Sequence, residues 1–295
     1  MTGTGFSSPE VQFVPELTPR IAFREYGEGE PAVLIHGLGG MSTNWTDLMH
    51  ALPLHGVAID LPGFGHSDPL SVAPTLTGYA DAVAAATSRI FPGRRVHLFG
   101  NSLGGSVALV LAQRHPELLA SVTLVSPAMP EYWPRRTNYQ VPVVALPVIG
   151  SKLFRRWQAF TPVQRMWGTV RVIYGEPTAV DPLRFREMVD ETVRRDALPH
   201  TADTYLAAVR ALLRAFLVRG NRGLWRCMAG IQAPLLVIYG RRDILVNSRL
   251  SHRVARARPG AVVALVLRAA HVSQMEFPTE VAALWHRHIG SAFRS

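Results

Sequence analysis

The chain has 295 residues, 48% of them hydrophobic and 18% charged, so it is long enough for one large core or a core with an inserted subdomain. Its formal net charge is +10, and the segment 130–228 holds 16 Lys and Arg residues against 8 Asp and Glu residues. No nucleic-acid motif accompanies this charge, no apolar run is long enough for a transmembrane helix, no secretory signal is recognisable, and the single Cys227 excludes an internal disulfide. We therefore expect a cytoplasmic protein without a nucleic-acid partner, and the basic segment leaves peripheral contact with an anionic membrane open.

Short apolar runs alternate with helical patterns through the first part of the chain. The predicted strands are residues 21–26, 32–35, 57–59, 96–99 and 121–125, and the predicted helices are 45–52, 77–90 and 103–114. Strands that alternate with helices at this spacing favour an α/β fold, in which a mostly parallel sheet has helices on both faces.

The alternation lapses between residues 130 and 228, a segment called the insertion below. It contains three helical patterns, at 151–157, 182–195 and 203–218, and the last has an apolar face made of Leu206, Val209, Leu213, Phe216 and Leu217. The alternation then resumes with a strand at 235–239, a helix at 249–257, a strand at 261–267 and a helix at 279–288. The sequence therefore predicts one α/β core, residues 1–129 and 229–295, interrupted by a helical insertion.

The most specific motif lies between the predicted strand 96–99 and the helix 103–114. Ser102 stands there within Gly100-Asn101-Ser102-Leu103-Gly104-Gly105, a G-x-S-x-G pattern on a strand-to-helix turn. Small neighbours are needed because the strand and the helix approach each other closely at such a turn. The pattern predicts that Ser102 is a nucleophile held in a strained backbone conformation.

Three further features follow predicted strands: Asp243, His271 and the glycine-rich loop His36–Gly40. The carboxyl ends of parallel strands meet at one edge of a sheet, so we expect all of them near Ser102. His271 is suited to take the serine proton, and Asp243 to orient the imidazole. Asp60, at another strand end, is the alternative to Asp243, although it is better placed to hold its own loop. The backbone N–H groups of Leu38 and Leu103 are the predicted donors to an oxyanion.

These motifs, together with Asp60-Leu61-Pro62-Gly63-Phe64-Gly65-His66-Ser67, resemble those of the α/β-hydrolase fold family and occur in its order, Ser then Asp then His. The resemblance implies a core of the predicted kind and a helical cap formed by the insertion. It also implies that His36 shapes the oxyanion turn. Serine at the elbow argues against dehalogenases and epoxide hydrolases, which resemble this chain but carry aspartate there.

The resemblance implies hydrolysis of a carboxylic ester or thioester of a hydrophobic acyl or ring compound, without a cofactor or metal. Hydrolysis of a carbon–carbon bond in a vinylogous diketone is the alternative, because the Gly-Asn-Ser-x-Gly-Gly elbow is shared with those enzymes, although the glycine-rich loop lacks their glycine–proline–glycine form. Proline-releasing peptidases, perhydrolases and a non-catalytic ligand receptor on the same fold are further alternatives. Within the insertion, Trp133, Trp157 and Trp167 either line an acyl pocket or form part of its core.

Overall fold

The structure is a computed structural model, and it describes residues 6–131, 145–220 and 223–290. One eight-stranded sheet has the order β1-β2-β4-β3-β5-β6-β7-β8. The strands are β1 (Gln12–Phe13), β2 (Ala22–Tyr26), β3 (Glu30–Ile35), β4 (Leu54–Ile59), β5 (Val96–Asn101), β6 (Leu119–Val125), β7 (Leu235–Gly240) and β8 (Val262–Val266). Strand β2 pairs antiparallel with β1 and β4. The six strands β4, β3, β5, β6, β7 and β8, in their order across the sheet, pair in parallel, so the predicted mostly parallel α/β sheet is confirmed.

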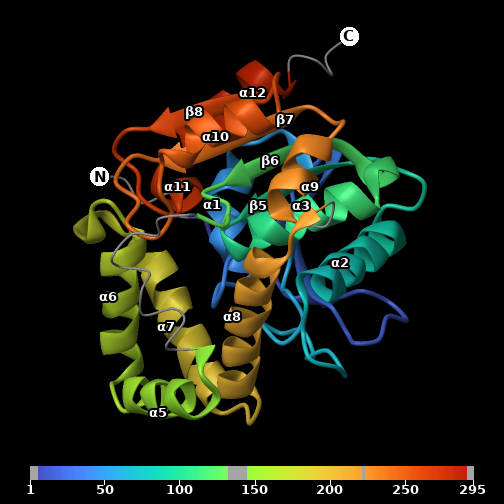
Figure 1. The fold of residues 1–295 in the computed structure, drawn as a ribbon. Coiled ribbons are helices and arrows are strands. Elements are labelled where there is room, and N and C mark those ends of the chain that lie inside the picture. The colour runs from blue at the N-terminus through green and yellow to red at the C-terminus, as the bar shows by residue number, and fades with distance from the viewer. Residues whose placement is uncertain (1–5, 132–144, 221–222, 291–295) are drawn as a thin grey trace.

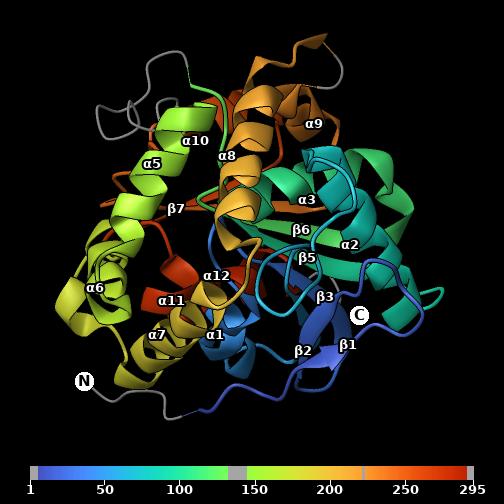
Figure 2. The ribbon, with the colours of Figure 1, turned by 90° about the horizontal axis from the view of Figure 1, so that it is seen from below.

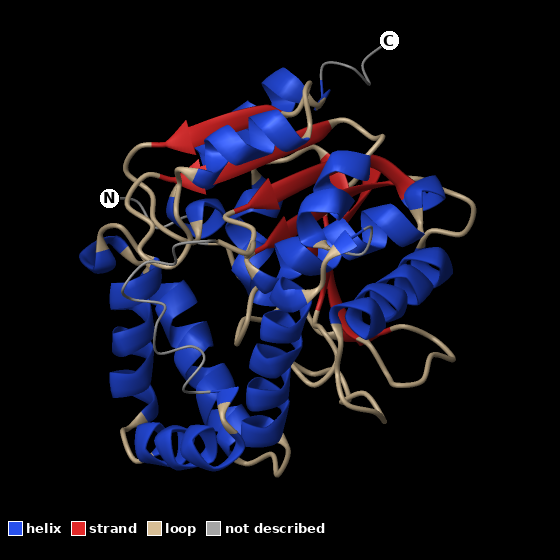
Figure 3. Ribbon diagram, in the orientation of Figure 1, coloured by secondary structure: helices blue, strands red, loops and turns tan. Residues whose placement is uncertain are grey.

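Helices cover both faces of this sheet, as Figures 1 and 3 show. One face carries α2 (Leu76–Ile90), α3 (Leu103–Arg114), α9 (Leu224–Gly230) and α10 (Leu250–Ala257). The other carries α1 (Thr46–His50), α11 (Ser273–Glu276) and α12 (Pro278–His288). Each face of the sheet buries its own apolar cluster. Val107 and Leu111 of α3 belong to the cluster on one face, and Val281 and Trp285 of α12 belong to the cluster on the other.

Among the described residues between β6 and β7, four α-helices precede α9: α5 (Pro147–Gln158), α6 (Pro162–Ile173), α7 (Pro182–Asp196) and α8 (Thr201–Leu217). Figures 1 and 2 show them as a group beside one edge of the sheet, apart from the helices on its faces. Their starts carry local signals: Thr161 forms a capping box with Gln164, and the Asp181 carboxylate accepts hydrogen bonds from the first turn of α7.

Two details of the insertion differ from the expectation. Helix α6 was not predicted, although Val163, Met166, Trp167 and Val170 have helical spacing; of these four residues, only Met166 and Val170 are buried. Leu217 was expected on the apolar face of α8 but is 79% exposed, and it is the residue at which α8 ends. Within the described ranges, no helix combines the length and hydropathy needed to cross a membrane.

Glycine is required where β3, β5 and α3 meet. A Cβ atom at Gly104 would lie 2.2 Å from the carbonyl oxygen of Ile35, and one at Gly100 would lie 2.5 Å from that of Gly104. These obstacles are backbone atoms, so no side-chain rotation relieves them. The two glycines let the start of α3 touch the ends of the central strands.

We therefore expect Gly104→Ala to lower the free energy of unfolding by about 3 kcal/mol, the upper part of the range for overpacking. Gly168→Ala is the matched control, because Gly168 lies within α6 and its added Cβ would meet nothing within 4 Å. That variant should be unchanged or more stable by up to about 1 kcal/mol, as expected for alanine in a helix. Urea unfolding followed by circular dichroism measures both, and equal effects would contradict the interpretation of Gly104.

Candidate active site

Ser102 lies on the turn between β5 and α3 with φ 52° and ψ −115°, a conformation that non-glycine residues rarely adopt. The turn is held by backbone hydrogen bonds on both sides: the Ser102 N–H donates to Val125 (3.1 Å), and the Ser102 carbonyl accepts from Ala128 (3.0 Å). Ser102 is half-buried at the carboxyl edge of the sheet. The strained turn thus fixes its position relative to β6.

Asp243 and His271 form a buried pair at the same edge. The Nδ1–H of His271 donates to Oδ2 of Asp243 at 2.9 Å, and the other Asp243 oxygen accepts from the backbone N–H groups of Leu245 (2.8 Å) and Val246 (2.9 Å). Burial by itself would raise the pKa of Asp243, but the charge and hydrogen bond of His271 and the backbone donors outweigh it and lower that pKa. Asp243 is therefore an anion at neutral pH and fixes the tautomer of His271.

Asn101 joins the serine turn to the histidine loop (residues 268–272). Its side-chain amide donates to the carbonyl of Val125 at 3.0 Å and to the carbonyl of His271 at 3.1 Å. No hydrogen bond connects Ser102 Oγ to the His271 ring among these described residues, and such contacts are often long before a substrate binds. The Asn101 contact brings the two loops together without it.

The glycine-rich loop lies directly against Ser102. A Cβ atom at Gly37 would be 3.2 Å from the Cβ of Ser102. His36 holds this loop from beneath, because its Nδ1–H donates to the Gly37 carbonyl (2.7 Å) while its Nε2 accepts from the Leu61 N–H (3.0 Å). Burial lowers the pKa of His36, and this hydrogen-bond pattern requires the neutral ring. The Leu103 N–H, at the first residue of α3, has no acceptor within its own helix, and the role of the Leu38 N–H as the second donor stays a prediction.

Asp60 serves a different loop. Its oxygens accept hydrogen bonds from the backbone N–H groups of Ser42 (2.6 Å) and His66 (2.9 Å), and its side chain is 1% exposed. Burial would raise the pKa of Asp60, but the His66 side chain and these backbone hydrogen bonds outweigh it and lower the pKa. The structure therefore brings Asp243, and not Asp60, to His271.

Two arginines of α7 contact loops at the edge of the site, and the sequence analysis did not single them out. Arg195 donates to the carbonyl of Gly39 at 2.9 Å, Arg194 donates to the carbonyl of Gly65, and Glu191 pairs with both guanidinium groups. No local motif marks such contacts, since they join residues more than a hundred positions apart. The arginines attach the insertion to the glycine-rich loop and to the Asp60 loop.

Glu276 makes a second attachment. Its Oε1 accepts from the N–H of Ala270 and its Oε2 from the N–H of Gly175, both at 2.6 Å. The His271 N–H also donates to the carbonyl of Ile173, the last residue of α6, at 2.9 Å. Burial raises the pKa of Glu276. The end of α6 and the histidine loop are therefore joined by three hydrogen bonds.

The three tryptophans have no demonstrated place in the site. Trp157 is 38% exposed and lies under the Arg165 guanidinium, and Trp167 is 37% exposed with its ring 4.7 Å from that of Phe185. Trp133 falls outside the described residues. An acyl-pocket role for them stays a prediction.

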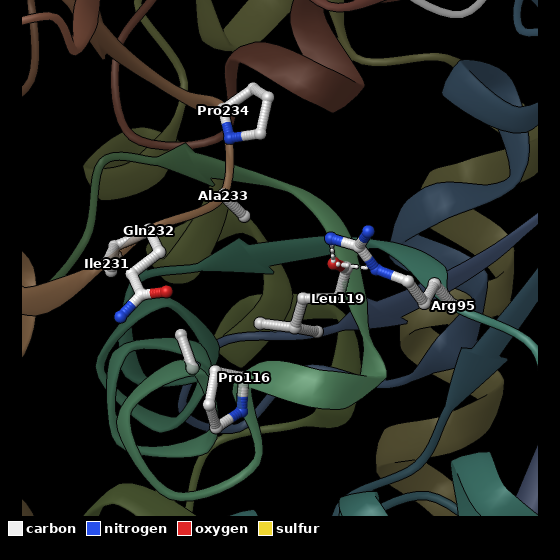
Figure 4. Close-up of a pocket in the computed structure, with 8 residues that line it drawn as sticks. Arg95, Pro116, Leu119, Ile231, Gln232, Ala233 and Pro234 are labelled. Atoms are coloured by element: carbon white, nitrogen blue, oxygen red, sulfur yellow. Dashed lines mark hydrogen bonds between the residues drawn. The ribbon is translucent and has the colours of Figure 1, made fainter.

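A cavity of about 180 Å³ lies elsewhere, near the amino ends of β5, β6 and β7 (Figure 4). It is lined by Arg95, Leu119 and Pro234, among others, and the Arg95 side chain donates to the Leu119 carbonyl. These residues lie at the opposite ends of the strands from Ser102, so the cavity is separate from the candidate site. In the part of the chain that the structure describes, no cluster of three or more His, Cys, Asp or Glu side chains is arranged to hold a metal.

The profile of a family described as alpha/beta hydrolase fold matches residues 31–278. The chain belongs to this family. The alpha/beta hydrolase match includes Leu38, Ser102, Asp243 and His271.

Named relatives differ in activity. The dihydrolipoyllysine-residue acetyltransferase component of the acetoin cleaving system of Cupriavidus necator is 28% identical over 90% of this chain, which spans 65% of that relative's length. A 2-hydroxy-6-oxononadienedioate/2-hydroxy-6-oxononatrienedioate hydrolase of Burkholderia vietnamiensis is 25% identical over 87% of this chain and 86% of its own. The crystal structure of a membrane phospholipase A has a TM-score of 0.74 at 24% identity, covering 99% of this chain and 88% of that chain, and shows the shared fold.

A buried and an exposed aspartate of this alpha/beta hydrolase, Asp60 and Asp68, should differ in what they contribute to stability. Asp60→Asn should lower the free energy of unfolding by about 2 kcal/mol, because an amide cannot accept from both Ser42 and His66. Asp68→Asn, which removes an exposed pair with Arg20, should cost less than about 1 kcal/mol.

The stabilisation of the folded protein by Asp60 should depend on pH. Its pKa in the folded protein lies below the usual 3.8, so its stabilisation is complete above that value and is lost as the pH falls below it. Urea unfolding at neutral and acidic pH measures this, and the difference between wild type and Asp60→Asn should shrink in acid. A constant difference would contradict the assignment.

Proposed function

We propose that this protein is a serine hydrolase that cleaves a carboxylic ester or thioester, with Ser102, His271 and Asp243 as its catalytic triad. The observation that carries the proposal is the buried Asp243–His271 hydrogen bond at 2.9 Å, tied through Asn101 to the strained turn that presents Ser102. A weak nucleophile, a neutral base and an anion that orients the base are the three groups that acyl transfer requires.

The reaction proceeds in two halves. Ser102 Oγ attacks the acyl carbon while its proton passes to Nε2 of His271, and Asp243 stabilises the resulting imidazolium. The N–H groups of Leu38 and Leu103 donate to the oxyanion of the tetrahedral intermediate. The intermediate collapses to an acyl-enzyme as His271 gives the proton to the leaving alcohol or thiol. Water, deprotonated by His271, then releases the carboxylic acid and restores Ser102.

The insertion, residues 130–228, acts as a cap over this site in the proposed enzyme. Its attachments through Arg195 and Glu276 support this, and so does an apolar cluster between the two parts. In that cluster, Met166, Val170 and Met188 of the insertion pack with Met41 and with Val272, the residue after His271. An apolar wall beside the base suits a hydrophobic acyl or ring substrate, as predicted from the sequence.

Carbon–carbon bond hydrolysis is the second candidate. Its support is the relationship to the Burkholderia vietnamiensis enzyme, whose name states that it hydrolyses a dienedioate or trienedioate. A non-catalytic receptor would keep the fold but release no product. A panel of chromogenic esters and thioesters of graded acyl length, assayed beside a vinylogous diketone, separates these candidates.

Ser102→Ala should reduce ester turnover by about 1,000-fold or more, because members of a triad act as a unit. A fluorophosphonate should add mass to a single peptide that contains Ser102. Urea unfolding of Ser102→Ala controls for misfolding. Near-normal turnover in a folded variant, or label on another residue, would overturn the proposal.

The arginine contacts predict a second kinetic effect. Arg195→Ala should lower kcat by about 10-fold with little change in KM, because the Gly39 carbonyl loses the contact that holds the loop bearing the Leu38 donor. Arg194→Ala is the matched control, since Arg194 shares Glu191 but donates to Gly65 on the other loop.

The two variants should differ in kcat when assayed with the same ester. A rise in KM alone for Arg195→Ala would instead mean that Arg195 contacts the substrate. Equal losses of kcat in both variants would mean that only the general attachment of the insertion matters.

A further inference from the structure

Helices α5 and α6 carry charge of only one sign. Their basic residues are Lys152, Arg155, Arg156, Arg165 and Arg171, and neither helix contains an Asp or Glu residue. Arg165 is buried and pairs with Asp196. In the described part of the chain, Lys152, Arg155 and Arg156 form no ion pair, and all three are exposed. Most of the positive charge of these helices therefore faces solvent.

Large apolar side chains are exposed on α5 beside these cations. Ile149, Leu153 and Trp157 follow one another at intervals of four residues, so they form one stripe along the helix. They are 44%, 42% and 38% exposed, and Val148 beside them is 66% exposed. Phe154 is buried between this stripe and α8, with its ring 5.5 Å from the ring of Trp157 and 5.5 Å from that of Tyr205 on α8. Helix α5 is therefore anchored on one side and presents an apolar and basic side outward.

The position of α5 suits a surface that docks. Figure 1 shows α5 at the end of the insertion farthest from the sheet, where α6 and α8 lead back to the core. The end of α6 is hydrogen-bonded to the N–H of His271, and Tyr205 of α8 lies against Gly39. Whatever binds α5 is therefore close to the elements that surround Ser102.

We propose that the outer side of α5, formed by Val148, Ile149, Lys152, Leu153, Arg155 and Arg156, docks onto an anionic lipid surface. Soluble proteins seldom expose a contiguous group of large apolar side chains without an occupant. A helix with apolar and basic residues on its free side lies in the interface of an anionic bilayer, where aliphatic groups enter the acyl boundary and cations meet the headgroups. A protein partner would need an acidic surface, which is the competing outcome.

Vesicle binding tests the surface directly. The full chain carrying Ser102→Ala is sedimented with vesicles of phosphatidylcholine alone and with vesicles that contain about one-third phosphatidylglycerol, so that turnover does not alter the lipid. We expect binding to the anionic vesicles only, falling as salt rises, because salt screens exposed charges over about 10 Å at 0.1 M. Equal binding to both vesicles, or no binding at low salt, overturns the proposal.

Matched variants locate the surface. Lys152→Gln/Arg155→Gln/Arg156→Gln should weaken binding to anionic vesicles by about 100-fold, at roughly 5-fold per cation. Arg226→Gln/Arg249→Gln/Arg256→Gln makes the same change in charge at three exposed positions, on α9, α10 and the N-cap of α10, away from α5, and should have a much smaller effect. Equal losses in the two triple variants would reject α5 as the site.

The apolar contribution and the competing occupant need separate measurements. Ile149→Ser/Leu153→Ser should weaken vesicle binding while leaving its salt dependence, and circular dichroism checks that each variant is folded. A dimer in solution that the same substitutions dissolve would assign the surface to a second copy of the chain and overturn the proposal. Vesicle binding does not depend on the proposed reaction. If the wild-type protein does not hydrolyse esters, the proposed function is wrong, but the expected vesicle binding is unchanged.

Discussion

The close contact between the start of α3 and the ends of β3 and β5 is the constraint on which the site depends. Gly104 sits against the carbonyl groups of Ile35 and His36, and Gly100 sits against Gly104. Any side chain at these positions would push the helix away from the strands. The same contact forces Ser102 into its strained turn and brings Gly37 against it, so the position of the candidate nucleophile and that of the glycine-rich loop follow from one packing arrangement.

Buried polar groups then set the charges around that turn. Asp60 and Asp243 both remain ionised in the interior because a histidine side chain, His66 for Asp60 and His271 for Asp243, and two backbone N–H groups stabilise each carboxylate. His36 remains neutral because burial disfavours its charge and its ring accepts from a backbone N–H. These groups orient loops without changing charge near neutral pH. His271, paired with a fixed anion, is the base of the proposed reaction.

The insertion is attached at the two places where the proposed chemistry needs rigidity. Arg195 holds the glycine-rich loop, and Glu276 joins the end of α6 to the residue before His271. The proposed lipid surface lies on the opposite side of the same four helices.

The sequence by itself determined the α/β core and the position of Ser102, because a strand, a tight glycine turn and a helix are local patterns that depend on neighbouring residues. It also singled out Asp243 and His271, since residues at the carboxyl ends of parallel strands must share an edge. Only the tertiary structure decided between Asp60 and Asp243 as the partner of His271, and only it revealed Arg195, Glu276 and helix α6. Those contacts join residues far apart in the chain, and the exposed stripe on α5 depends on which side packs against α8. The contacts leave no local signal in the sequence, and the four-residue spacing of Ile149, Leu153 and Trp157 marks one side of a helix without deciding whether that side is buried or exposed.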